Sequence, residues 1–118
     1  MSKETGDKGE AIAANYLRKK GYNVLHVKWR YLHLELDIIA QKDNILVVVE
    51  VKTGNSTNFG DPHEWVTRTK QKRVIKAADA YVLAHDIETE TRFDIIAVVF
   101  TAQGPQVDHI EDAFSTVS

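Results

Sequence analysis

Two neighbouring apolar segments, Leu34–Gln41 and Ile45–Thr53, are separated only by a short polar break that contains Asp43 and Asn44. Asp and Asn readily adopt the backbone conformations that tight turns require, so the break predicts a two-residue hairpin turn. Such a turn pairs the residue before it with the residue after it, and the register then continues back along both strands. No other feature of the chain constrains the fold as much, because this turn decides which residues face each other.

Each predicted strand of this hairpin carries two charged residues spaced i, i+2, in segments that are otherwise built to be buried. Glu35 and Asp37 share one face of the first strand, opposite Ile38 and the neighbouring leucines, and Glu50 and Lys52 share one face of the second. The register places Asp37 opposite Glu50 and Glu35 opposite Lys52. A four-residue loop would keep this pairing, whereas a three-residue loop would separate the groups onto opposite faces.

Two carboxylates held directly opposite each other, with Cβ atoms about 5 Å apart, destabilise a sheet unless a cation compensates for their charge. Lys52 offsets part of that charge, and a divalent metal would satisfy both acids, since hard oxygen ligands suit Mg²⁺ and Mn²⁺. The alternative is a surface patch in which Glu35 pairs with Lys52 and Asp37 is solvated. Glu50 favours the metal site, because it follows an unbroken apolar run and therefore lies deep in a central strand.

The remaining pattern gives the order α, three β, α, β, β. A strand–helix–strand crossover normally returns the chain parallel to the strand that it left, so we expect a mixed sheet. Before the hairpin, the sequence predicts a helix through Ile12–Leu17 that stops at Gly21, and a strand at Asn23–Arg30. After the hairpin, it predicts a helix that is capped at Asp61-Pro62 with Glu64, is interrupted near Thr67 and ends near His85. A strand at Arg92–Phe100 and a short edge strand at Gln106–Ile110 follow.

The composition fits one soluble globular domain spanning residues 1–118. The 118 residues include no cysteine, which excludes disulfides, thiolate zinc sites and a cysteine nucleophile. No apolar run approaches the roughly 20 residues needed to span a bilayer, and the N-terminal sequence has no apolar signal core, so we expect a cytoplasmic protein with no membrane partner. The net charge of -2 excludes a protein that is a polycation as a whole.

Positive charge is nevertheless concentrated in one segment of the second predicted helix. Its basic residues, with no acid among them, are Arg68, Lys70, Lys72, Arg73 and Lys76. Arg68, Lys72 and Lys76 are spaced i, i+4, i+8 and form one stripe, which predicts a nucleic-acid-binding surface. Because the helix follows the second hairpin strand closely, its start should lie near Glu50. The alternative is an ordinary solvated helix face.

Together, these residues resemble the motifs of a known group of proteins. A helix bearing Glu10, then Asp37 and Glu50-x-Lys52 on successive strands, resembles the core of PD-(D/E)XK nucleases. More narrowly, the chain resembles the YraN-like uncharacterised protein family 0102, with archaeal Holliday junction resolvases as more distant relatives. The chain departs from that family at Leu34 and Lys28, where glycine and asparagine are usual. The matching pieces are Gly9-Glu10, Ala13, Tyr16-Leu17, Gly21-Tyr22, Glu35-x-Asp37-x-Ile39-Ala40, Val49–Lys52, Gly60, Lys72-Arg73, Ala77-Ala78, Tyr81 and Arg92–Asp94.

The resemblance implies an α/β fold with a restriction-endonuclease-like αβββαβ core, in which helices flank a mixed central sheet. It also implies a metal-dependent endonuclease that cleaves phosphodiesters of branched or structured DNA. Asp37, Glu50 and the Val51 carbonyl would hold Mg²⁺ or Mn²⁺, and Lys52 would orient a water or stabilise charge developing on the phosphate. Glu10 would reach the metal directly or through water, or else only favour the helix dipole.

Two other classes remain open at this point: a catalytically silent DNA-binding module with the nuclease fold, and a protein-interaction module. Fold alone does not decide between them. A symmetric homodimer is a further expectation, because an enzyme that resolves junctions must cut two strands.

Overall fold

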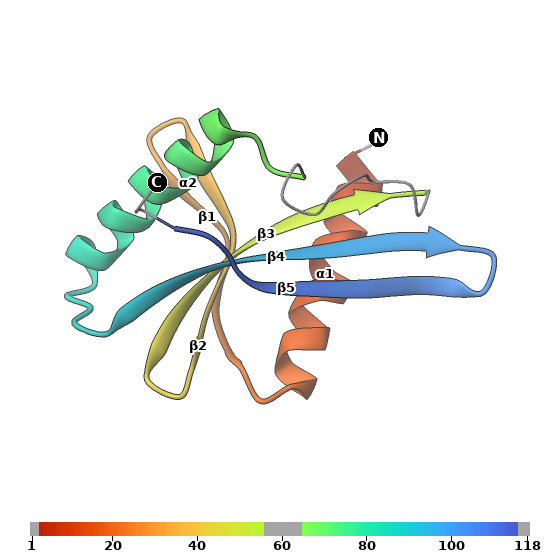
Figure 1. The fold of residues 1–118 in the computed structure, drawn as a ribbon, viewed down its shortest axis with the longest axis horizontal. Helices are drawn as coiled ribbons and strands as arrows, with labels where there is room; N and C mark the ends of the chain where they lie inside the picture. Colours follow the sequence, from red (N-terminus) through yellow and green to blue (C-terminus); the bar gives the residue numbers. More distant parts are fainter. Residues whose placement is uncertain (1–2, 56–64, 116–118) are drawn as a thin grey trace.

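The computed structural model describes residues 3–55 and 65–115, which form an α/β fold with one sheet and two helices (Figure 1). Its order confirms the predicted α, three β, α, β, β. The elements are α1 (Lys3–Lys19), β1 (Asn23–Tyr31), β2 (Leu34–Lys42), β3 (Ile45–Gly54), α2 (Arg68–Ala84), β4 (Glu90–Thr101) and β5 (Gly104–Phe114).

The sheet is mixed, as predicted. Its strands lie in the order β1-β2-β3-β4-β5, which is also their order along the chain. β1, β2 and β3 form an antiparallel meander, α2 then crosses over to bring β4 parallel to β3, and β5 returns antiparallel to β4. β4 and β5 run together as a long hairpin toward the right-hand end of the molecule in Figure 1.

The two helices cover opposite faces of the sheet (Figure 1). On one face, Ala13 and Leu17 of α1 pack against buried β2, β3 and β4 residues such as Val47. On the other face, Val74 and Tyr81 of α2 pack against a second set of buried side chains. Neither helix in the described ranges has a stretch long and apolar enough to cross a membrane.

The predicted hairpin turn is confirmed. Asp43 and Asn44 have φ angles of 50° and 66°, the left-handed conformation of a two-residue turn, and Lys42 pairs with Ile45. The ladder between β2 and β3 ends at the pair Ile38–Val49, although both strands continue beyond it. The two strands therefore stop pairing just where their charged residues begin.

The predicted face of Ile38 is wrong. Leu34 and Leu36 pack into the core under α2, whereas Ile38 packs into the core under α1. Strict alternation would place all three side chains on one face. The alternation breaks at Asp37, at the position where the β2–β3 ladder ends, so the period of two does not apply across it.

α2 begins at Arg68, and Thr67 caps it: the Thr67 hydroxyl accepts a hydrogen bond of 3.1 Å from the backbone N–H of Lys70. The predicted break near Thr67 is thus the start of this helix. The predicted cap at Asp61-Pro62 with Glu64 lies outside the described residues.

β5 was expected to be a short edge strand at Gln106–Ile110, and this prediction is wrong because the strand runs from Gly104 to Phe114. Its register against β4 shifts between Ile110, which pairs with Ile95, and Phe114, which pairs with Phe93. The polar Glu111 and Asp112 fall at this irregularity and interrupt the apolar alternation, which is why the sequence pattern ends too early.

Candidate functional site

A cleft of about 410 Å³ opens where β2 and β3 stop pairing, beside the start of α2. Every residue that the sequence singles out for catalysis or metal binding lines it. The lining residues are Glu10 of α1, Asp37 of β2, Glu50, Val51 and Lys52 of β3, Trp65, Val66 and Thr67 before α2, and Lys70 of α2.

Asp37 takes the place of a backbone group in the interrupted ladder. Its Oδ2 accepts a hydrogen bond of 2.9 Å from the backbone N–H of Val51. The predicted direct pairing of Asp37 with Glu50 therefore does not continue the ladder, because the aspartate side chain bridges to the next residue of β3. This bond fixes the Asp37 carboxylate at the mouth of the open hairpin.

Glu50 is buried, with 5% of its surface exposed, and its carboxylate lies near that of Asp37. Burial raises the pKa of Glu50, and the neighbouring charge of Asp37 raises it further, while Lys70 opposes the shift. Burial also raises the pKa of Asp37, against the hydrogen bond from Val51. Both pKa values rise mainly because the two carboxylates are buried, and the positive charge of Lys70 offsets this only in part.

The nearest cation to Glu50 is Lys70, whose Nζ lies 3.7 Å from Oε2, beyond hydrogen-bond distance. The other oxygen, Oε1, is buried and has no hydrogen-bond partner among the described residues. A buried carboxylate oxygen without a partner is costly and calls for an explanation. The donor set in this cleft, carboxylate and carbonyl oxygens with no sulfur, fits a hard divalent cation such as Mg²⁺ or Mn²⁺.

Glu35 does not pair with Lys52, so that part of the predicted register is wrong. It forms an ion pair of 3.1 Å with Arg30 on β1 instead, because β2 remains paired with β1 after it has left β3. Among the described residues, ligand oxygens of Glu10, Glu35 and Asp37 lie within 4.8 Å of one another. Asp37 thus belongs to this acidic group and also lies beside Glu50.

Lys52 lines the cleft from β3 with an exposed side chain. It forms no ion pair with any of the described acidic residues, although Glu50 is only two positions away on the same strand. Its ammonium is therefore available to a bound anion at the cleft.

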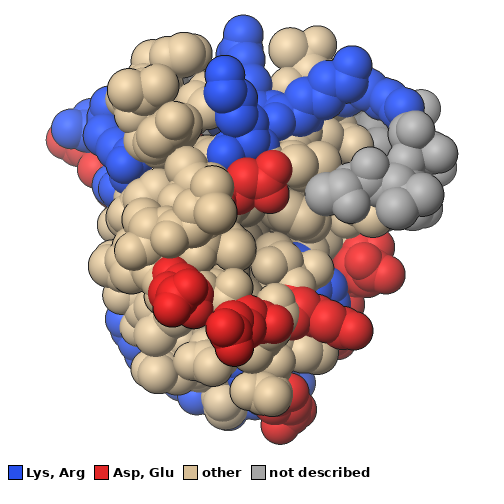
Figure 2. All heavy atoms as spheres, turned by 90° about the vertical axis from the view of Figure 1, so that its left-hand side faces the viewer, with Lys and Arg blue, Asp and Glu red and all other residues tan. Residues whose placement is uncertain are grey.

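The basic residues of α2 all lie on its exposed side, while Val74, Ala78 and Tyr81 are buried against the sheet. Of the five, only Lys70 reaches the cleft. Figure 2 shows Lys and Arg side chains gathered over the upper part of this side of the molecule, with Asp and Glu concentrated below. The start of the basic helix thus adjoins the acidic cleft, which confirms the predicted position.

The sequence comparison agrees with the motifs. Residues 9–98, a range that contains every predicted site residue, match the family described as Uncharacterised protein family UPF0102. The chain belongs to this family. A UPF0102 protein of Flavobacterium psychrophilum is 45% identical over 111 residues, covering 94% of this chain and 93% of the relative. UPF0102 proteins of Parabacteroides distasonis and Bacteroides thetaiotaomicron are each 47% identical, covering 94% of this chain and 92% of each relative.

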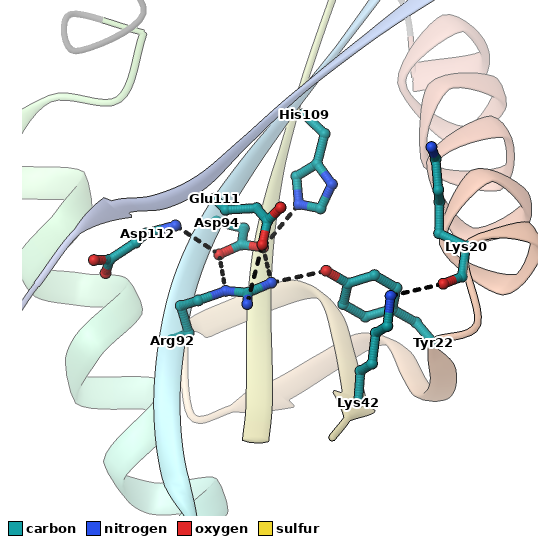
Figure 3. A network of polar contacts seen from close by, with 8 residues as sticks. All are labelled: Lys20, Tyr22, Lys42, Arg92, Asp94, His109, Glu111 and Asp112. Atoms are coloured by element: carbon teal, nitrogen blue, oxygen red, sulfur yellow. Dashed lines mark hydrogen bonds and ion pairs between the residues drawn. The ribbon is translucent and has the colours of Figure 1, made fainter. Parts of the chain in front are cut away.

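One polar network of this UPF0102 chain was missed at the sequence level (Figure 3). The Asp94 carboxylate, fully buried on β4, accepts hydrogen bonds from Arg92 at 2.9 Å, from the backbone N–H of Asp112 at 3.0 Å, and contacts His109 Nε2 at 2.7 Å. Arg92 also donates to the Tyr22 hydroxyl at 2.8 Å. An aspartate that leads into a long apolar strand was the available signal for this network.

Lys28 was also missed as a neighbour of the site in this UPF0102 chain. Its Nζ lies 2.6 Å from Glu10 Oε1 and 2.7 Å from Asp7 Oδ1. No spacing rule connects Lys28 to Glu10, because the contact depends on how α1 lies across β1.

Proposed function

We propose that this protein is a divalent-metal-dependent endonuclease that hydrolyses phosphodiester bonds of branched or otherwise structured DNA. The observation that supports it most is the buried Glu50 carboxylate, beside Asp37 in a cleft that also contains Lys52 and Lys70. One of its oxygens has no hydrogen-bond partner in the part of the chain that the structure describes. Acids that share too little positive charge are destabilising in a purely structural role and useful in a cation site.

Asp37 and Glu50 would hold Mg²⁺ or Mn²⁺, with the Val51 carbonyl as a further oxygen ligand. The bound ion would polarise the phosphate and lower the pKa of a coordinated water. The Asp37 carboxylate accepts a hydrogen bond from the Val51 N–H, which holds it in place for this role. Its side chain therefore does not need to be ordered when the cation binds.

The two lysines of the cleft act on the phosphate. Lys52 has an exposed ammonium without an ion pair to the described acids, so it can oppose charge that develops on the phosphate oxygens. Lys70 extends from the basic helix to within 3.7 Å of Glu50 and connects the surface that would hold the DNA backbone to the cleft. Backbone contacts from such a helix position DNA without reading its sequence, so selectivity for DNA structure is expected.

The test is cleavage of four-way, flap, duplex and single-stranded DNA in the presence of Mg²⁺ or Mn²⁺. We expect structured DNA to be cut, activity to be lost in Asp37→Asn and Glu50→Gln, and Lys52→Ala to fall by about 100-fold or more while remaining folded. Lys19→Ala, which removes an exposed lysine from the far end of α1, is the matched control and should retain activity.

Calorimetric titration with Mn²⁺ tests the cation site separately from the reaction. Wild-type protein should bind the ion and Asp37→Asn should bind it more weakly. Equal Mn²⁺ affinity in the two proteins would refute the metal site, whereas DNA binding without any cleavage would favour the catalytically silent module.

A further inference from the structure

Glu10 lies on the α1 side of the cleft in a crowded acidic environment. Its carboxylate can approach those of Glu35 and Asp37 within 4.8 Å, and only 13% of its side chain is exposed. Like charges at this separation and burial repel one another, so Glu10 needs a cation nearby. Arg30 serves this role for Glu35 at 3.1 Å, whereas Lys70 is 3.7 Å from Glu50 and compensates it only in part.

The cation nearest Glu10 is Lys28, which reaches it from β1. The ammonium lies 2.6 Å from Glu10 and 2.7 Å from Asp7, so it bridges two acids on successive turns of α1. The two carboxylates raise the pKa of Lys28, Asp7 more than Glu10. This lysine is therefore charged under all ordinary conditions.

The backbone at Lys28 has an unusual conformation. Its φ angle of 57° lies in the left-handed region, which disfavours a residue with a Cβ atom and is found mainly for Gly, Asn and Asp. Such a conformation persists where the surrounding structure overdetermines it. Here the two short ion pairs and the flanking pairing of β1 with β2 hold it.

We propose that Lys28 is a positioning residue that occupies Glu10, so that a divalent cation binds through Asp37 and Glu50 without Glu10 as a direct ligand. The inference rests on the proposed function and specifies its metal site. The tethered ammonium neutralises the Glu10 side of the acidic group. Glu10 Oε1 and Glu50 Oε1 are both buried without a hydrogen-bond partner among the described residues, but Glu10 Oε1 has the Lys28 ammonium 2.6 Å away. The ion pair of Glu50 is to its other oxygen, so Glu50 Oε1 is the one left for an ion from solution.

The experiment is a double-mutant cycle on the full-length protein, with Mn²⁺ affinity measured by calorimetry in the absence of DNA. In wild-type background, Glu10→Gln should leave the affinity nearly unchanged. Lys28→Gln should free Glu10 and raise the affinity about tenfold, the scale of effect that partners of metal ligands have. In Lys28→Gln background, Glu10→Gln should remove that gain.

Two further variants keep the result interpretable. Lys28→Asn suits the left-handed backbone and should behave as Lys28→Gln does, which covers the case in which glutamine disturbs folding there. Lys8→Gln removes an exposed charge of the same helix two residues from Glu10 and should not change the affinity.

An unchanged Mn²⁺ affinity in both Lys28 variants would overturn the inference, as would a large loss of affinity on Glu10→Gln alone. If wild type binds Mn²⁺ through Asp37 and the Lys28 variants bind equally well, only this inference fails. If no variant binds Mn²⁺, the proposed metal site fails and the inference fails with it.

Discussion

Two buried carboxylates of this protein, Asp94 and Glu50, are in opposite situations. Asp94 is fully buried and its oxygens are met by Arg92, His109 and a backbone N–H. Glu50 is almost as buried, but one oxygen has no partner among the described residues and its nearest cation is 3.7 Å away. A satisfied buried charge is a structural element, whereas an unsatisfied one is typical of a functional site.

Asp94→Asn should therefore destabilise the protein strongly. Breaking a buried ion pair from one side leaves Arg92 with only the exposed Glu111 as an acidic partner, at 3.1 Å, and the free energy of unfolding should fall by about 3 kcal/mol. Chemical denaturation measures this loss. Asp112→Asn is the matched control: its side chain is exposed, asparagine tolerates its φ of 52°, and its stability should be unchanged.

The loss of stability caused by Asp94→Asn should depend on pH. Burial alone would raise the pKa of Asp94, but hydrogen bonds from His109, Arg92 and the Asp112 N–H hold it below its ordinary value of about 3.9. A lowered pKa in the native state stabilises the fold above the unfolded pKa, and this contribution is lost as pH falls through the native value. The stability difference between wild type and Asp94→Asn should therefore shrink as the pH falls below about 4. A difference that is independent of pH would contradict this assignment.

At the scale of elements, the position of α1 depends on one glycine. Gly9 is buried against Thr53 of β3, and a Cβ atom at position 9 would overlap Thr53 Cγ2. The absence of a side chain lets α1 approach β3 closely, which brings Glu10 to the edge of the cleft. Both the packing of α1 on the sheet and the position of Glu10 in the acidic group thus depend on the absence of a side chain at Gly9.

Gly9→Ala should destabilise the protein by about 1 kcal/mol, because the cost of overpacking exceeds the gain in helix propensity. Thr53→Ser removes only Cγ2 and retains the hydroxyl, so Gly9→Ala should become neutral or stabilising in that background. Gly6→Ala should stabilise α1, because no described atom outside the neighbouring helix backbone lies within 4 Å of the added Cβ. Thermal unfolding of the four variants tests this, and equal effects at positions 6 and 9 would contradict the close contact.

The elements themselves were largely predictable from local signals. The Asp43-Asn44 turn set the hairpin register, and the crossover helix implied the parallel pairing of β3 with β4. The errors lie where tertiary structure interrupts a period: at Asp37, where β2 leaves β3, and at Asp112, where β5 shifts against β4. Local propensity contains no information about such breaks, since they depend on neighbouring strands.

For the site, sequence identified the acids but not their partners. Asp37, Glu50 and Lys52 belong to one hairpin, so spacing and register were sufficient to bring them to one cleft. Lys28 and the Asp94 network depend instead on packing between segments far apart in the chain. Contacts of that kind follow from the completed fold, and no spacing rule expresses them.

At the scale of the whole molecule, charge is unevenly distributed despite a net value of -2 (Figure 2). Basic side chains of α2 form an exposed stripe whose first turn adjoins the cleft, so a DNA backbone lying along the helix would lead toward Glu50 and Lys52. Because the protein as a whole is weakly acidic, the DNA binding that we propose would depend on this stripe.

Reversing two charges of the stripe, in Arg68→Glu with Lys72→Glu, should weaken binding to a four-way junction. The slope of log affinity against log salt should fall by about 2, because each lysine or arginine contact releases roughly one counterion. Fluorescence anisotropy over a salt series measures the slope. Arg18→Glu with Lys19→Glu makes the same change in net charge on α1 and should leave the slope unaltered. Identical slopes in both double variants would mean that the stripe is an ordinary solvated helix face that does not bind DNA.

The irregular backbone of the two outer strands has a consequence for self-association. An edge strand offers unpaired N–H and C=O groups to any second chain, and proteins avoid aggregation by interrupting that row. β1 is interrupted by a register shift near Leu25 and the left-handed Lys28, and β5 by Pro105 and the left-handed Asp112. Lys28 also forms the ion pair with Glu10, and the backbone N–H of Asp112 donates the hydrogen bond to Asp94. The same local breaks therefore oppose sheet extension, which disfavours a homodimer formed by pairing the edge strands β1 or β5 of two copies.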